Sequence, residues 1–236
     1  MSTGWHVTAE HIVKWTETNP RRAQETLPLL VKRLIFESVS PSLIRFPSGD
    51  SVLEKGWDGI LKTSGGNAYV PLGESAWELS TQKSVAKKAN EDYSKRTKNP
   101  EGIDKKASTF VFVTTRKWRY RNWLSMKKTQ GQWLDIKVLT PIELVDWLEK
   151  CPSVHRWFAR LIGNRPEGAW DLEQAWDAWS LATKPPCNTD LVIAGRKDKS
   201  MQLSQLLSSK ADIISISAET KEEAYAYVIA SIKMHE

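Results

Sequence analysis

Two acidic residues have a spacing that suits a divalent cation. Asp58 lies in Gly56-Trp57-Asp58-Gly59, and Glu78 follows 20 positions later. Two acids on either side of a glycine-marked turn are brought side by side when the segment folds as a β-hairpin. Adjacent carboxylates repel each other unless a cation lies between them, and their hard oxygen atoms suit Mg²⁺. The sequence therefore predicts a magnesium site formed by Asp58, Glu78 and the carbonyl oxygen of Leu79. The alternative is a pair of surface acids.

Such a site has the chemistry of phosphodiester hydrolysis, for which a lysine is expected nearby. The metal would activate a water for attack on phosphorus and neutralise the charge on the phosphate. In many metal-dependent nucleases, a lysine two residues after the glutamate stabilises the transition state. Ser80 occupies that position here. The candidates are Lys83, at the start of the next helix, and Lys87 and Lys88, one turn further on; Lys88 could lean over the strand that carries Glu78, whereas Lys87 should point outward. The alternative for each lysine is a phosphate contact or a solvated side chain.

A basic stretch follows the acidic pair. The segment from Lys83 to Lys128 carries 14 Lys/Arg residues against 4 Asp/Glu, in a chain of net charge +6. Clustered positive charge favours nucleic-acid binding because phosphate contacts release counterions. Within it, residues 116–123 alternate cations and aromatic rings, which can grip a backbone and stack on bases. The alternatives are a solvated charged face and tryptophans packed beneath a charged rim.

Composition excludes several other classes of protein. The 236 residues contain no apolar run of about 18 residues and no signal-peptide pattern, so we expect no membrane span and a cytoplasmic location. Cys151 and Cys187 lack zinc-ligand spacing and favour a reducing compartment. The sequence also lacks a phosphate-binding loop and a nucleophile elbow.

Periodicity predicts the elements that would position these residues. Apolar spacing and capping signals indicate helices over 8–15, 20–38, 84–97, 140–150 and 151–161. Thr140 and Glu143 form a capping box, and Val85, Ala89 and Tyr93 are the expected inward stripe of the helix over 84–97. β-Branched and aromatic runs indicate strands over 57–61, 68–70, 75–79, 109–114 and 133–139, with 45–51 as a loop. This order predicts an α/β fold with a mixed central sheet flanked by helices.

The remaining third of the chain is expected to lie outside this domain. A boundary is predicted within 163–168, followed by a Trp-rich helix over 171–181. Strands over 191–196 and 213–216, with helices over 203–209 and 220–233, predict a β-α-β-α segment. This segment is too short for a domain of its own, so we expect it to be the start of a larger one. A weaker hypothesis treats 147–179 as a docking surface for neighbouring protomers.

Several strings of residues together resemble a known family. They are Leu27-Pro28-Leu29-Leu30 with Leu34-Ile35, Phe46-Pro47 with Gly56-Trp57-Asp58-Gly59, Val70-Pro71-x-Gly73-x-Ser75-x-Trp77-Glu78, and Lys88-Ala89-x-x-Asp92-Tyr93-x-x-Arg96-Thr97. Over residues 9–163, the chain resembles the Mrr-like restriction-endonuclease-fold domain found at the N-terminus of bacterial antiviral STAND NTPases. The resemblance implies a Mrr-like nuclease domain over 1–165, a Trp-rich helical linker over 166–189, and the start of an NTPase-associated domain over 190–236.

The resemblance implies a PD-(D/E)xK fold and Mg²⁺-dependent cleavage of double-stranded DNA, with Mn²⁺ able to substitute. Cleavage would be switched on when the full protein senses a phage component and assembles into a tetramer or other oligomer. Asp58 and Glu78 match the metal-binding acids, and Glu37 matches a helix glutamate that some members place beside the metal. Lys88 lies in one of the matching strings, so the resemblance favours it as the catalytic lysine, with Lys83 second. DNA contacts are expected from Lys83, Arg96, Arg116, Arg119 and Arg121. The alternative is a catalytically degenerate module that binds DNA or oligomerises.

Overall fold

The structure is a computed structural model that describes residues 6–47, 56–164, 172–209 and 213–235. The chain divides into two compact units, Met1–Pro166 and Glu167–Glu236, which are described separately. This division places a boundary inside the predicted range of 163–168.

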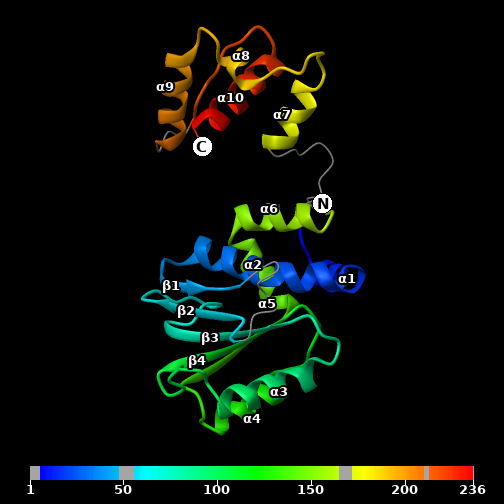
Figure 1. Ribbon diagram of the computed structural model, residues 1–236, viewed down its shortest axis with the longest axis vertical. Helices are drawn as coiled ribbons and strands as arrows, with labels where there is room; N and C mark the ends of the chain where they lie inside the picture. The colour runs from blue at the N-terminus through cyan, green and yellow to red at the C-terminus, as the bar shows by residue number, and fades with distance from the viewer. Residues whose placement is uncertain (1–5, 48–55, 165–171, 210–212, 236) are drawn as a thin grey trace. The chain divides into compact units, whose positions relative to one another are not determined.

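The first unit is built on a five-stranded mixed sheet (Figure 1). Its strands lie in the order of the sequence: β1 (Pro41–Arg45), β2 (Gly59–Thr63), β3 (Gly73–Ser80), β4 (Ser108–Thr114) and β5 (Asp135–Leu139). The β1–β2 and β2–β3 pairs are antiparallel, and the β3–β4 and β4–β5 pairs are parallel. The predicted α/β class with a mixed sheet is therefore confirmed.

Two local features of this unit differ from the sequence-based expectation. Residues 41–45 form the edge strand β1, where no strand was predicted and where Arg45 was expected to begin a loop. Residues 68–70 form no strand because the side chain of Asn67 accepts hydrogen bonds from the backbone N–H groups of Tyr69 and Val70, both at 2.8 Å. An asparagine that bonds its own downstream backbone favours a turn over a strand.

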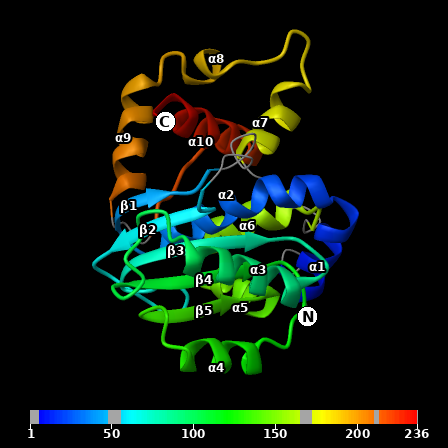
Figure 2. The ribbon, with the colours of Figure 1, turned by 60° about the horizontal axis from the view of Figure 1, so that its bottom comes forward.

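Helices cover both faces of the sheet (Figures 1 and 2). One layer consists of α1 (Ala9–Thr18), α2 (Pro20–Ser38), α5 (Pro141–Glu149) and α6 (Pro152–Leu161). The other consists of α3 (Val85–Lys98) and α4 (Arg121–Thr129), and α4 was not predicted. Strand β4 is buried along its whole length: Val111 and Val113 pack in the first layer, and Phe110 and Phe112 pack in the second. A strand covered on both faces is apolar throughout rather than alternating.

Local signals explain where the helices begin. The predicted capping box at Thr140 and Glu143 starts α5, and a similar reciprocal cap at Thr8 and His11 starts α1. Helix α2 continues through Pro28. The predicted inward stripe of α3 at Val85, Ala89 and Tyr93 is buried, but Asp92 and Arg96 are buried as well. A helix with both apolar and charged buried residues contributes to the core and to a polar site.

The second unit is helical in the residues that the structure describes. It comprises α7 (Leu172–Ser180), α8 (Thr189–Ile193), α9 (Lys197–Ser208) and α10 (Lys221–His235). Its small core contains Trp176, Val192, Ile193, Ile229 and Ala230. Helix α7 packs within this unit, so the predicted linker over 166–189 is, in the structure, part of the second unit from residue 172 onward.

The two strands of the predicted β-α-β-α segment do not form, whereas its two helices do, as α9 and α10. Residues 191–193 belong to α8 because the side chain of Asn188 accepts a hydrogen bond from the Leu191 N–H and caps a helix there. Described residues 213–216 form no strand, and Ile213 is exposed. A short β-branched run needs a partner strand, and none lies within the described part of this unit. None of the described helices is both long and apolar enough to cross a bilayer.

Candidate active site

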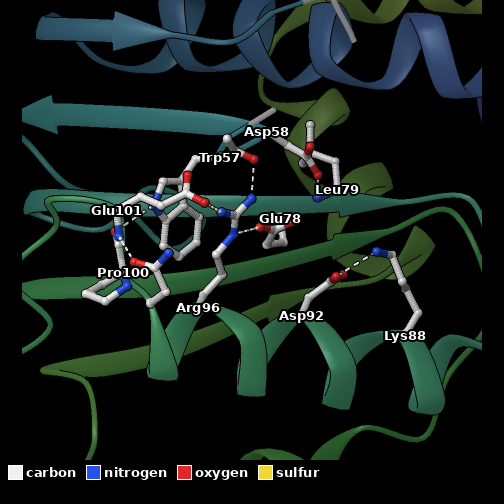
Figure 3. A network of polar contacts seen from close by, with 11 residues as sticks. Trp57, Asp58, Glu78, Leu79, Lys88, Asp92, Arg96, Pro100 and Glu101 are labelled. Atoms are coloured by element: carbon white, nitrogen blue, oxygen red, sulfur yellow. Dashed lines mark hydrogen bonds and ion pairs between the residues drawn. The ribbon is translucent and has the colours of Figure 1, made fainter. Parts of the chain in front are cut away.

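A polar cleft of about 550 Å³ opens in the first unit between α2, the C-terminal end of the central strand β3, and α3. Asp58, Glu78 and Lys88, the three residues with predicted catalytic roles, all line it. They come from three separate elements: the start of β2, strand β3 and helix α3 (Figure 3). Asp92 and Arg96 on α3 also line the cleft.

The register of the sheet positions Asp58. The β2–β3 ladder begins with Gly59 opposite Trp77, so Leu79 has no backbone partner on β2. The side chain of Asp58 takes that place, because its Oδ2 accepts a hydrogen bond from the Leu79 N–H at 2.7 Å. Glycine follows Asp58 for a steric reason: a Cβ at Gly59 would lie 2.2 Å from the ring of Phe46. The backbone next to the acid is therefore closely packed.

Glu78 is the buried acid of the site. It lies on β3 opposite Phe112 of β4, and only 4% of the residue is exposed. Burial raises the pKa of its carboxyl group to about 8, and the negative charges of Asp58 and Asp92 act in the same direction. The hydrogen bond and charge of Arg96 oppose this rise. The ionised form of Glu78 is therefore disfavoured in the metal-free cleft, and a cation there would favour it.

Lys88 is held by an acid on its own helix. Its Nζ donates a hydrogen bond to Oδ1 of Asp92, one turn further along α3, at 2.6 Å. Burial would lower the pKa of Lys88, but the hydrogen bond and charge of Asp92 outweigh burial, and the pKa is raised. Lys83 and Lys87 are exposed and do not line the cleft. The structure thus places Lys88, and neither of the other two, beside the acids.

Arg96 is the residue of this site whose role sequence reasoning missed. It is 1% exposed, and its Nε donates a hydrogen bond to Oε1 of Glu78. Its Nη2 donates to the carbonyl oxygen of Gly56, and its Nη1 lies 2.7 Å from Oε1 of Glu101. The guanidinium also lies over the ring of Trp57, 4.6 Å from its centroid. The predicted DNA contact by Arg96 is therefore corrected, because its guanidinium is buried and faces Glu78, Gly56 and Glu101 inside the protein.

Two other predicted site residues lie elsewhere. Glu37 does not line the cleft: its carboxylate accepts hydrogen bonds from the N–H groups of Ser153 and Val154, at 3.1 and 3.0 Å, at the start of α6. A carboxylate is favoured there because the N-terminus of a helix carries unsatisfied N–H groups and a positive dipole end. Arg116 is also buried, and it donates to Glu17 and to the carbonyl oxygen of Thr81, both at 3.0 Å.

The other predicted DNA contacts remain at the surface. Lys83, Arg119 and Arg121 are exposed. The aromatic residues between the arginines pack instead: the ring of Trp118 lies 5.9 Å from that of Phe112 and 5.3 Å from that of Trp123. The structure thus favours tryptophans packed beneath a charged rim over rings free to stack on bases.

The oxygen atoms in the cleft fit the predicted Mg²⁺. Oδ2 of Asp58 and Oε1 of Glu78 are engaged by Leu79 and Arg96, which leaves one oxygen of each acid for a cation. Asp92 contributes a buried Oδ2 that has no hydrogen-bond partner among the described residues. The described residues contain no group of three or more acids, histidines or cysteines arranged to hold a metal. Mg²⁺ suits a site with two carboxylates because it usually retains waters and binds substrate phosphates.

Comparisons of this chain with protein-family models, with curated proteins and with solved structures give no match. The residues of the cleft are therefore the basis for assigning a function. One signal in the sequence could have identified the α3 contribution: Lys88, Asp92 and Arg96 recur every four residues and so share one face of the helix.

Proposed function

We propose that residues 1–165 form a metal-dependent endonuclease domain of the PD-(D/E)xK type that hydrolyses double-stranded DNA. The observation that carries this proposal is that Asp58, Glu78 and Lys88 line one cleft. They reach it from different elements, and Lys88 takes the place of the lysine that the usual motif would put at position 80. The mixed sheet, with the two acids at the paired ends of β2 and β3, supports the fold assignment.

The residues of the cleft have distinct roles in this proposal. Asp58 and Glu78 would hold Mg²⁺ through the oxygen atoms that the protein leaves open. When bound, Mg²⁺ supplies Lewis-acid activation of a water and neutralises charge on the phosphate. Lys88 has a raised pKa and is therefore protonated at neutral pH, so it acts as a cation that stabilises the developing negative charge and not as a base. Asp92 holds the ammonium group of Lys88 in place.

DNA is the proposed substrate because exposed positive charge follows both β3 and β4. Lys83 comes three residues after the end of β3, and Arg119 and Arg121 lie between β4 and the first turn of α4. Phosphate contacts from such side chains position a duplex without reading its sequence. We further propose that a phage component sensed by the full-length protein triggers cleavage, and that assembly into a tetramer or other oligomer raises activity.

Plasmid cleavage tests the proposed function. The chain is incubated at high concentration with supercoiled DNA and Mg²⁺ or Mn²⁺, beside Glu78→Ala and an EDTA control. Nicked and linear products that require the metal and disappear in the variant are expected, with the circular dichroism spectrum unchanged. Cleavage that persists in folded Glu78→Ala would remove Glu78 from the mechanism.

A catalytically degenerate DNA-binding module is the second candidate function. Two observations favour it: Ser80 stands at the usual lysine position, where it is buried, and Arg96 already neutralises part of the charge on Glu78. This candidate predicts DNA binding without metal binding. Calorimetric titration of the chain with Mn²⁺ separates the two, because the endonuclease binds Mn²⁺ and loses that binding in Asp58→Ala, whereas the degenerate module shows no heat of binding in either protein.

A further inference from the structure

The side chain of Arg96 joins the two segments that carry the acids. Its Nε bonds the Glu78 carboxylate on β3, and its Nη2 bonds the carbonyl oxygen of Gly56, two residues before Asp58 (Figure 3). Gly56 has a φ of 135°, a conformation that side chains disfavour. The glycine therefore turns the backbone so that its carbonyl faces the guanidinium.

The guanidinium has two further contacts. Its Nη1 forms an ion pair with Glu101 at 2.7 Å, and its central carbon lies over the ring of Trp57. Trp57 is fixed in turn, because its Nε1 donates a hydrogen bond to the carbonyl oxygen of Pro100 at 3.0 Å. A planar guanidinium with a fork of donors can bond several acceptors at fixed angles, which the single ammonium group of a lysine cannot do.

The burial of Arg96 and Glu78 costs free energy, which indicates a role for the pair other than stabilising the fold. Removing a charge from water carries a large desolvation penalty, and a buried ion pair is weak evidence for stability. Here the paired acid is Glu78, which lines the cleft, and no described residue donates a hydrogen bond to its other oxygen, Oε2. The hydrogen bond from Arg96 to Oε1 thus orients the carboxylate and leaves Oε2 open to a ligand.

We propose that Arg96 is a positioning residue that fixes the separation and orientation of Asp58 and Glu78 for the metal. It acts on Glu78 directly and on Asp58 through the Gly56–Trp57 backbone. This inference rests on the proposed function and deepens it, because it assigns the geometry of the metal site to a residue on α3 that binds neither metal nor DNA. Partners of this kind, which orient metal ligands, typically change metal affinity by about 10- to 100-fold when they are removed.

The test measures Mn²⁺ affinity by calorimetry, together with kcat and KM for plasmid cleavage, in Arg96→Lys and Arg96→Gln. Arg96→Lys keeps the charge and loses the fork. Mn²⁺ affinity is expected to fall about 10- to 100-fold in both variants, and kcat should fall while KM for DNA stays unchanged. Lys98→Gln is the matched control: it removes one exposed positive charge from the same helix, outside the cleft, and should leave Mn²⁺ affinity unchanged.

Folded Arg96→Lys with wild-type Mn²⁺ affinity and kcat would overturn the proposal. If neither Arg96 variant folds, Glu101→Gln carries the test, since it frees Nη1 and leaves the other bonds of Arg96 in place. Its Mn²⁺ affinity is then expected to fall several-fold, and an unchanged affinity would equally overturn the proposal. Failure of the proposed function has a different signature, because the wild-type protein itself would then neither bind Mn²⁺ nor cut DNA.

Discussion

Asp58 accepts a hydrogen bond from the backbone N–H of Leu79 at 2.7 Å, which ties the first acid of the cleft to the residue that follows the second. The bond completes the edge of the β2–β3 ladder, where Leu79 has no backbone partner on β2. Oδ2 of Asp58 therefore supports the fold, and Oδ1 is left open to a cation in the cleft.

Because the two oxygen atoms of Asp58 have different roles, two substitutions at this position should have different outcomes. Asp58→Asn can still accept the bond from Leu79, so its thermal stability should stay close to wild type, but the lost charge should reduce cleavage by about 100-fold or more. Asp58→Ala should lose both activity and stability, because the Leu79 N–H is left unpaired. Melting temperatures and plasmid cleavage rates, measured side by side, check this. Equal stability losses in the two variants would contradict the role of the bond.

Burial of Glu78 predicts a pH-dependent stability of the metal-free protein. The pKa of Glu78 is about 8 in the folded state against 4.5 for an ordinary glutamate, so the folded state binds this proton more tightly than the unfolded state. The resulting stabilisation is complete below pH 4.5 and is lost as the pH rises to about 8. Glu78→Gln should therefore melt higher than wild type above pH 8 and nearly the same below pH 4.5. Melting curves across pH in EDTA test this, and a constant difference would contradict it.

Lys88 and Lys87 offer a matched pair of neighbours. Lys88 lines the cleft and is paired with Asp92, whereas Lys87 is exposed and lies 3.9 Å from Glu91. Lys88→Met should lower kcat by about 100- to 1000-fold, because a charge aimed at the phosphate is lost. Lys87→Met should cut DNA at the wild-type rate. Single-turnover cleavage with saturating metal is the measurement, and equal rates in both variants would remove Lys88 from the site.

The basic surface predicts a change in salt dependence. Arg119 and Arg121 are exposed, whereas Arg116 is buried between Glu17 and the backbone at Thr81. The double substitution Arg119→Gln/Arg121→Gln should weaken DNA binding and reduce the slope of log K against log salt by about 2, since each phosphate contact contributes about 0.9. Arg116→Gln should instead lower the free energy of unfolding by about 1–3 kcal/mol. Fluorescence anisotropy at several salt concentrations measures this slope. An unchanged slope in the double variant would contradict the DNA contacts of Arg119 and Arg121.

The contacts of Glu37 predict that its substitution lowers stability and leaves metal binding unchanged. Its carboxylate bonds two N–H groups at the start of α6 and does not line the cleft. Glu37→Ala should cost about 0.5–2 kcal/mol of folding free energy, as the loss of other N-terminal caps does. Mn²⁺ affinity should be the same as in the wild type. Weaker Mn²⁺ binding by the folded variant would return Glu37 to the metal site.

The sequence by itself determined the features that short-range physics controls. The β-branched run at 109–114 predicted the buried strand β4, and the Thr140–Glu143 capping box predicted the start of α5. The spacing of Asp58 and Glu78 across a glycine-marked turn predicted that both lie in one place, and they share the cleft. Each of these signals is contained in a few neighbouring residues or in one hairpin.

Tertiary structure alone decided which distant side chains meet. Arg96 and Glu78 are separated by 18 residues, and their contact depends on how α3 packs across the sheet. Glu37 was assigned to the metal site through the family resemblance, but the approach of α6, whose Val154 is 117 residues away, determines its partners. The β-branched residues after Leu191 predicted a strand, but no partner strand is present in the described part of that unit. The cap at Asn188 instead starts a helix there. A pattern along the sequence is compatible with several contact partners for one residue. The packing of the elements in space decides which of them it meets, because contact energies depend on distances in space.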